Sequence, residues 1–251
     1  KDKHYGKINM KAVILAAGVG SRIKPLTDNC PKILLKVGNK TILERMVSHI
    51  QDCGLNEIIF VVGYLKEQIK YYVKTKFPDL NVSFVTNDKY AETNTGYSLM
   101  LVKDFIQDSG FIKFDADVVF DKKILKKLIE CKHESCLCVD KNINIDAEEI
   151  KVIIDNQNRI LKANKTVNPK DAVGESIGIE KISKETAKLL FKELELMMQD
   201  KKNHQEYYEG AYERLIVNNV PFYALDISGL KWVEIDTRED FDLGIKIFSN
   251  A

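Results

Sequence analysis

A short apolar run that breaks into small residues near the start of the chain constrains the fold more than any other feature. The run Ala12–Leu15 leads directly into Ala16-Ala17-Gly18-Val19-Gly20-Ser21-Arg22, and Pro31-Lys32 follows further along. A buried strand that ends in small residues allows backbone N–H groups to approach an anion closely, and an arginine and a lysine nearby add positive charge. The pattern therefore predicts a strand followed by a loop that binds a polyphosphate.

Two other phosphate-binding patterns do not fit this loop. A Walker loop ends in Gly-Lys followed by Ser or Thr, which is missing here, and a dinucleotide fingerprint would have a third small residue in place of Ile23. A dinucleotide site also favours an acidic residue after the second strand, where this chain has Gly63-Tyr64. A tight turn without a ligand remains as the simpler alternative, and Arg22 and Lys32 count against it.

Apolar runs alternate with segments of helical period through the first half of the chain. The predicted strands are 12–16, 58–62, 82–86 and 111–114, and the predicted helices between them are 41–52, 65–76 and 97–107. This alternation implies right-handed crossovers and an α/β fold, with a doubly wound, mostly parallel, Rossmann-like sheet flanked by helices. Because the carboxyl ends of parallel strands share one edge, we expect Gly18, Asn87 and Asp117 to converge there.

The rhythm changes after Asp117, where antiparallel strands are expected to extend the sheet and wall the pocket. The predicted elements are a hairpin over 151–154 and 159–161, a strand at 174–179, helices at 184–199 and 205–218, strands at 221–225 and 232–235, and a closing helix at 240–248. We expect a single domain over 10–251, preceded by an extension or linker over 1–9.

The charge balance directs attention to a local site. Among 251 residues, Lys and Arg total 38 and Asp and Glu total 37, so no global field favours nucleic acid or an anionic membrane. No apolar run approaches the roughly 20 residues that span a bilayer. The five cysteines are an odd number in a chain too large to need disulfides, which suits a reducing compartment. We therefore expect a cytoplasmic protein without nucleic-acid or membrane partners.

Two acidic motifs far apart in the chain complete a recognisable pattern. Asp115-Ala116-Asp117 follows the predicted strand 111–114, and Trp232-Val233-Glu234-Ile235-Asp236 follows much later. With the glycine loop and Pro31-Lys32, these motifs make the chain, from Met10 onward, resemble the nucleotidyltransferases that activate sugar phosphates and small phosphorylated alcohols with a nucleoside triphosphate. The resemblance implies the GT-A-like nucleotidyltransferase fold.

Within that family, the chain is most similar to the short CTP-dependent cytidylyltransferases, which act on phosphocholine, aminoethylphosphonate, inositol phosphate or related molecules. Gly63-Tyr64 after the second strand and Tyr97-Ser98 at the start of the mid-chain helix carry this similarity. Many members that act on sugar phosphates have a glutamine and a Gly-Thr-Ala run where this chain has Asn94-Thr95-Gly96-Tyr97-Ser98. That departure counts against a hexose phosphate as substrate.

The acidic motifs supply candidate ligands for Mg²⁺. Magnesium keeps several waters and needs only one or two protein carboxylates beside phosphate oxygens, which Asp117 and Asp236 can provide from distant strand ends. The resemblance assigns the metal to the same two aspartates, with Asp115 and Glu234 as support. The simpler alternatives are an acidic turn after the strand and an aspartate that caps the final helix near Thr237.

Basic side chains are expected to neutralise the triphosphate. Arg22 and Lys32 would contact the β- and γ-phosphates or the bridging oxygen, and the resemblance places Lys162 near the acceptor phosphate, so these three form the expected catalytic set. The nucleotide site implied by the loop and the resemblance consists of Leu15, Ala16, Ala17, Gly18, Gly20, Ser21, Arg22, Asn87, Asn94, Gly96 and Asp115.

The acceptor is expected to lie against lysines suited to a phosphate and acids suited to an amine or hydroxyls. This acceptor site consists of Lys162, Lys165, Glu175, Ser176, Tyr208 and Glu209. For Tyr208 and Glu209, an exposed helix face is the alternative.

These inferences together predict a magnesium-dependent cytidylyltransferase that transfers CMP from CTP to a phosphorylated small molecule and releases pyrophosphate by in-line attack. CTP and that acceptor are the expected partners, and a second copy of the chain is a candidate partner in a homodimer. Three alternatives stay open: a sugar-1-phosphate uridylyl-, thymidylyl- or guanylyltransferase, a nucleotide-sugar glycosyltransferase, and a nucleotide sensor without catalysis.

Overall fold

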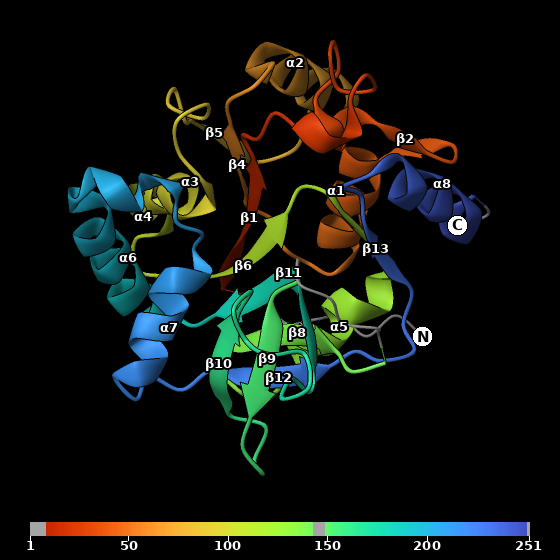
Figure 1. The fold of residues 1–251 in the computed structure, drawn as a ribbon. Helices are drawn as coiled ribbons and strands as arrows, with labels where there is room; N and C mark the ends of the chain where they lie inside the picture. Colours follow the sequence, from red (N-terminus) through yellow and green to blue (C-terminus); the bar gives the residue numbers. More distant parts are fainter. Residues whose placement is uncertain (1–8, 143–148, 250–251) are drawn as a thin grey trace.

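The computed structural model describes residues 9–142 and 149–249, so all but the last residue of the expected leading segment 1–9 lies outside it. Within the described residues, a mixed nine-stranded sheet forms the centre (Figure 1), with a main path in the order β10-β9-β11-β6-β1-β4-β5 and with β8 joining β11 to β12. Its strands are β1 (Met10–Ala16), β4 (Ile58–Val62), β5 (Val82–Thr86), β6 (Gly110–Asp115), β8 (Cys136–Asp140), β9 (Lys151–Ile154), β10 (Ile160–Asn164), β11 (Gly174–Ile182) and β12 (Tyr223–Asp226).

The direction of the strands changes at β11. β1 pairs in parallel with β4 and β6, and β4 pairs in parallel with β5. β11 runs antiparallel to β6, β8 and β9, and β9 and β10 form the expected antiparallel hairpin. Two short antiparallel ladders lie outside the sheet, one between β2 (Lys36–Val37) and β3 (Lys40–Thr41) and one between β7 (Val118–Phe120) and β13 (Trp232–Glu234).

Helices cover both faces of the sheet, which confirms the predicted doubly wound α/β fold. On one face lie α1 (Ile42–Asp52), α2 (Lys66–Lys76), α5 (Lys122–Glu130) and α8 (Arg238–Phe248). On the other face lie α3 (Thr95–Met100), α4 (Lys103–Ile106), α6 (Lys184–Gln199) and α7 (Glu209–Val217). None of the helices in the described part of the chain is both long and apolar enough to cross a membrane.

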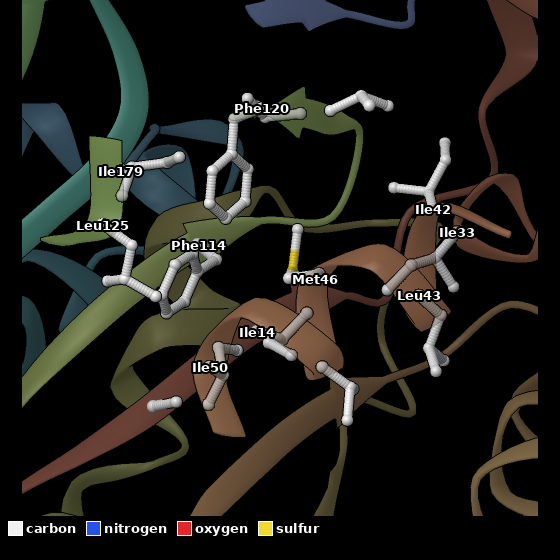
Figure 2. Packing of buried hydrophobic residues seen from close by; sticks show 14 of the residues in the cluster. Ile14, Ile33, Ile42, Leu43, Met46, Ile50, Phe114, Phe120, Leu125 and Ile179 are labelled. Atoms are coloured by element: carbon white, nitrogen blue, oxygen red, sulfur yellow. The ribbon is translucent and has the colours of Figure 1, made fainter. Parts of the chain in front are cut away.

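The side chains of each strand alternate between two hydrophobic layers. Ile14 of β1 and Phe114 of β6 face the layer that contains Met46 and Ile50 of α1 (Figure 2), whereas Val13 packs in the opposite layer. Burying each large apolar side chain contributes roughly 1.5–3 kcal/mol, so strands covered on both sides are rigid supports. The loops that follow β1 and β6 are therefore held in place by the core on either side of the sheet.

Two predicted helices differ from the observed ones. The segment 97–107 forms α3 and α4 with a turn between them, and α7 begins at Glu209 rather than at 205. The delay of α7 has a clear cause, because the carbonyls of His204 and Glu206 accept hydrogen bonds from the backbone N–H groups of Asn94 and Gly96 at 2.8 and 3.3 Å. Those carbonyls are therefore engaged across the fold instead of in the first turn of a helix.

The acid stability of the fold is expected to depend on His49 of α1. Its ring packs against Phe120, with the ring centroids 5.4 Å apart, and burial followed by the charge of Lys122 lowers its pKa to about 4. An unfolded histidine titrates near 6.5, so the unfolded state binds more protons and the free energy of unfolding falls as the pH drops from about 6.5 towards 4. Between pH 7 and pH 5, the free energy of unfolding of His49→Gln should therefore fall by roughly 1–2 kcal/mol less than that of the wild type.

Urea unfolding of the wild type and the variant at both pH values measures this difference. His133→Gln, which changes an exposed histidine, is the matched control and should lose as much stability on acidification as the wild type. Equal losses in wild type and His49→Gln would contradict the assignment.

Candidate active site

A cleft of about 900 Å³ opens where β1 and β6 end. Its lining includes the glycine loop, Pro31-Lys32 and the acidic segment after β6, together with residues from β11, from the start of α7 and from β13. The segments that the sequence predicted to converge from opposite ends of the chain therefore meet at the carboxyl edge of the parallel strands, where open α/β sheets bind ligands.

The shape of the glycine loop depends on the absence of a side chain at Gly20. Gly20 has φ 65° and ψ 44°, and a Cβ atom there would lie 3.1 Å from Cγ2 of Thr27 and 3.3 Å from Cε of Lys32. Gly20 therefore satisfies the left-handed conformation and the close approach of Lys32 at once. A Cβ at Gly18 would meet nothing within 4 Å, so the space beside this residue is open to a ligand.

Three carboxyl groups gather at one end of the cleft. Each of Asp117, Glu234 and Asp236 offers an oxygen, and these atoms all lie within 4.8 Å of one another. Nζ of Lys32 is 2.9 Å from Oδ2 of Asp117 and 2.7 Å from Oδ1 of Asp236, and Nη2 of Arg22 is 2.6 Å from Oδ2 of Asp236. The expected basic pair and the expected acidic pair are thus in direct contact. We call Asp117, Glu234 and Asp236 the acidic cluster.

The protein positions this cluster through backbone contacts. The antiparallel pairing of β13 with β7 sets Glu234 opposite Val118, and the N–H of Ile235 donates to the carbonyl of Asp117 at 3.0 Å. Thr237, not Asp236, caps α8, since its hydroxyl accepts from the N–H of Asp240 and the Asp240 carboxylate accepts from the N–H of Thr237. The side chain of Asp236 is thereby left for Lys32 and Arg22, which settles the alternative of a helix cap.

Crowding shifts the pKa values of the cluster in opposite directions. Burial, followed by the charges of Asp117 and Asp236, raises the pKa of Glu234 to about 9. Burial alone would raise the pKa of Asp236, but Lys32 and then Arg22 hold it below its ordinary value. Burial would likewise lower the pKa of Lys32, but the two aspartates raise it above its ordinary value. Lys32 therefore compensates the negative charge of Asp236, whereas Glu234 holds its proton to a higher pH than an ordinary carboxyl group does.

A second, more deeply buried network supports the floor of the cleft. Lys113 of β6 is fully buried, and its Nζ lies 2.9 Å from Oδ2 of Asp115 and 2.8 Å from Oε2 of Glu180 on β11. The hydroxyl of Tyr208 contacts Nζ of Lys113 and donates to Oδ2 of Asp115 at 2.6 Å. Gly178, at φ 74°, permits this approach, because a Cβ there would lie 2.4 Å from Oδ2 of Asp115. We call Lys113, Asp115, Glu180 and Tyr208 the buried network.

The structure places most of the predicted nucleotide residues on the cleft, with three exceptions. Those that line it are Leu15, Ala16, Gly18, Gly20, Ser21, Arg22, Asn94 and Asp115. Ala17 is buried beside it, and its carbonyl accepts from the N–H of Tyr64 at 3.0 Å. Asn87 is buried too, and its amide donates to Thr93 and Ser98 at 3.0 Å each, so it shapes the loop that carries Asn94.

Gly96 is the third exception. A Cβ at this position would lie 2.8 Å from the carbonyl oxygen of Glu206, so the glycine allows close packing against the segment before α7 rather than against a ligand.

The predicted acceptor residues divide in the same way. Ser176, Tyr208, Glu209 and Lys165 line the cleft, and Tyr208 and Glu209 are buried, which rules out an exposed helix face for them. Lys162 projects from an exposed position of β10 and does not line the cleft. Glu175 is buried in β11 and is likewise not among the lining residues. Successive strand residues point to opposite faces, so having Ser176 in the cleft turns Glu175 away from it.

Sequence reasoning missed Lys113 and Glu180 of the buried network and gave Glu234 only a supporting part. A signal was present, because Lys113 is a charged residue inside the mostly apolar strand β6 and Glu180 follows the apolar residue Ile179 in β11. Charged side chains are almost never buried there unless they are paired, so the two together indicate an internal ion pair. Burial raises the pKa of Glu180 to about 8, and the charge of Lys113 opposes that rise.

The sequence is similar to a family of NTP transferases and to known cytidylyltransferases. Residues 12–145 match the protein family described as the MobA-like NTP transferase domain. The CTP:phosphoglutamine cytidylyltransferase of Campylobacter jejuni is 31% identical, in a match that covers 94% of this chain and 100% of that protein. A choline-phosphate cytidylyltransferase of Streptococcus pneumoniae is 45% identical, but this match covers 47% of the chain and only 48% of the relative.

Solved structures agree over nearly the whole chain. The structure of the CTP:phosphocholine cytidylyltransferase from Streptococcus pneumoniae superposes with a TM-score of 0.79 at 28% identity, covering 96% of this chain and 99% of that one. The inositol-1-phosphate CTP transferase of T. maritima superposes with a TM-score of 0.80, and the match covers 98% of both chains. Because the two sequences are only 20% identical, this likeness supports the fold and nothing further.

Proposed function

Because the chain belongs to the family of the MobA-like NTP transferase domain, we propose that it is a cytidylyltransferase that transfers CMP from CTP to a phosphorylated small molecule. One observation carries the assignment of the site: Lys32 joins carboxylates from two distant motifs directly beside the open glycine loop. The relatives named above that use CTP support the choice of nucleotide. The reaction they share requires a site that holds a triphosphate together with a second anion.

The chain's own residues account for the main demands of this reaction. An anionic oxygen of the acceptor attacks the α-phosphorus of CTP, the new P–O bond forms, and the bond to the β-phosphate breaks as pyrophosphate leaves with the electron pair. Arg22 and Lys32 supply positive charge for the leaving group, and the backbone at Gly18 leaves room for the triphosphate. The acceptor oxygen is already ionised at neutral pH, so positioning and charge neutralisation replace a dedicated base.

The acidic cluster fits a magnesium ion. Its donors are all carboxyl oxygens, which suit a hard cation, and Oδ1 of Asp117 is buried without a hydrogen-bond partner among the described residues. Asp117, Asp236 and Glu234 would hold the ion. When bound, Mg²⁺ supplies positive charge to the phosphate oxygens.

The experiment measures pyrophosphate release with Mg²⁺, each nucleoside triphosphate in turn and a panel of phosphorylated small molecules. We expect release with CTP and with no other nucleotide. Release with UTP, dTTP or GTP and a sugar 1-phosphate would assign the chain to the sugar branch instead. Sugar transfer from a nucleotide sugar would indicate a glycosyltransferase, and calorimetric binding of CTP without turnover of any acceptor would indicate a sensor.

A further inference from the structure

Two buried carboxylate oxygens of residues that line the cleft have no hydrogen-bond partner among the described residues. Asp115 gives its Oδ2 to Lys113 and Tyr208, whereas its Oδ1 is buried and has no hydrogen-bond partner among the described residues. Glu209, in the first turn of α7, is only 7% exposed. Its Oε2 is also buried and has no hydrogen-bond partner among the described residues. Both residues line the cleft. Buried carboxylate oxygens are normally hydrogen-bonded, so two such atoms in one cleft point to a missing donor.

Within the buried network, Lys113 and Tyr208 have no hydrogen left for these two oxygens. The ammonium of Lys113 has three N–H groups, and its contacts with Asp115, Glu180 and Tyr208 use all of them. The Tyr208 hydroxyl has one hydrogen, which Oδ2 of Asp115 accepts. Neither group has a further hydrogen for Oδ1 of Asp115 or for Oε2 of Glu209. Among the described residues, the hydrogens of Lys113 and Tyr208 are therefore all engaged, and a molecule bound in the cleft can supply the donor.

The acceptor is the molecule in a position to provide it. Asp115 lies two residues before Asp117 of the acidic cluster, so its carboxylate is close to the place proposed for the reacting phosphates. Glu209 adjoins Tyr208, which holds Asp115. An acceptor whose phosphate lies near the acidic cluster would extend its other end along the floor of the cleft towards Glu209.

On the basis of the proposed function, we infer that Glu209 and Asp115 together select for a hydrogen-bond donor at the end of the acceptor opposite the phosphate. Acceptors that end in a primary ammonium, an amide or a hydroxyl carry such N–H or O–H groups. They are preferred over acceptors that end in a trimethylammonium group. A trimethylammonium group has positive charge but no hydrogen to donate to these oxygens. A site that hydrogen-bonds a substrate N–H or O–H disfavours the analogue that lacks it, because the site's buried polar atoms are then left unsatisfied.

Two of the aromatic rings that line the described part of the cleft, those of Tyr207 and Tyr208, already have a lysine over them. Such cages hold the cation against open faces of aromatic rings. Nζ of Lys165 already lies 5.0 Å from the ring centroid of Tyr207. The ring of Tyr208 faces Nζ of Lys113, 3.7 Å from its centroid. Hydrogen bonding to carboxylate oxygens is therefore the recognition that this end of the cleft favours.

The test compares three acceptors that share a phosphate and a two-carbon spacer: phosphoethanolamine, 2-hydroxyethyl phosphate and phosphocholine. With CTP and Mg²⁺, we expect kcat/KM for each of the first two to exceed that for phosphocholine by at least about tenfold. Calorimetric titration of the same compounds into the protein should give the same order of affinity. The hydroxyl compound separates hydrogen bonding from charge, since it donates a hydrogen without being a cation.

Glu209→Gln shows whether this residue carries the preference. The amide keeps the shape of the side chain but removes a carboxylate acceptor. The ratio of kcat/KM for phosphoethanolamine to kcat/KM for phosphocholine should therefore fall about tenfold, and the change in KM should account for more of this fall than the change in kcat. Glu206→Gln makes the same change at an exposed residue outside the cleft and should leave the ratio unchanged. The thermal unfolding of both variants reports whether they are folded.

Different outcomes separate this inference from the proposed function. Turnover with CTP in which phosphocholine matches or exceeds the other two acceptors would overturn the inference and leave cytidylyl transfer in place. An unchanged ratio in Glu209→Gln would do the same for the assignment to Glu209. Pyrophosphate release only with a nucleotide other than CTP would overturn the proposed function, while the calorimetric order of the three acceptors would still decide the inference.

Discussion

Asp236→Asn is expected to lower kcat/KM for CTP by at least about a thousandfold while the protein stays folded. The asparagine keeps the size of the side chain but removes a charge that now lies 2.7 Å from Nζ of Lys32 and 2.6 Å from Nη2 of Arg22. It also removes one carboxylate from the acidic cluster. Lys32 and Arg22 therefore lose an ion-pair partner, and the proposed cation loses a ligand. Because Asp236 lies in the cleft rather than in the hydrophobic core, the cost to stability should be small.

Pyrophosphate release at several Mg²⁺ concentrations measures the effect, and thermal unfolding checks the fold. Asp242→Asn, which makes the same change at an exposed residue of α8, should keep the turnover of the wild type. Turnover in Asp236→Asn within about tenfold of the wild type would remove this residue from the reaction and, with it, the proposed cation site.

Lys32→Met should produce the second large loss, about a hundredfold or more in kcat/KM. Lys32 is the cation that lies between Asp117 and Asp236, and methionine matches its aliphatic length without the charge. The variant also predicts an effect on stability. Without the ammonium, the carboxyl groups of the acidic cluster repel one another, so the variant should unfold at a lower temperature than the wild type in EDTA.

Mg²⁺ should reverse much of this destabilisation if the cluster binds the ion, because a ligand that binds only the folded state stabilises it. Thermal unfolding with EDTA and with Mg²⁺ tests this, next to Lys24→Met as the control. Lys24 is exposed, pairs with Asp28 at 3.5 Å and lies outside the cleft lining, so its variant should resemble the wild type. A Lys32→Met protein that is equally stable in EDTA and in Mg²⁺ would count against a cation at the acidic cluster.

Local patterns were sufficient to predict the glycine loop and the acidic motifs. Gly18 and Gly20 directly follow a buried strand, and the conformation of Gly20 depends on the absence of a side chain there. Asp117 is the second residue after the end of β6, so its place at the edge of the sheet follows from the alternation of strands and helices. Each of these inferences needs only the chain's neighbours in sequence and the topology of parallel strands.

Predictions that depended on packing between distant segments were less accurate. Lys162 is turned away from the cleft and Lys165 towards it, because the path of the chain after β10 decides which lysine reaches the site. Asn87 and Gly96 have the expected residue types for a ligand contact, but their partners are Thr93, Ser98 and the backbone of Glu206. A polar side chain or a glycine serves a loop as readily as a ligand, and one sequence does not distinguish the two uses.

By itself, the sequence determined the class of fold, the edge of the sheet at which a polyphosphate is proposed to bind and the two acidic motifs that meet there, because strand and helix periodicity and turn residues act over short distances. Only the tertiary structure decided that Lys32 lies between Asp117 and Asp236, that Glu234 completes the acidic cluster, and that Lys113 is fully engaged beneath Asp115. These arrangements depend on the pairing of β7 with β13 and of β6 with β11. The physical reason is that the register between strands distant in the chain results from packing of the whole core, which no local pattern records.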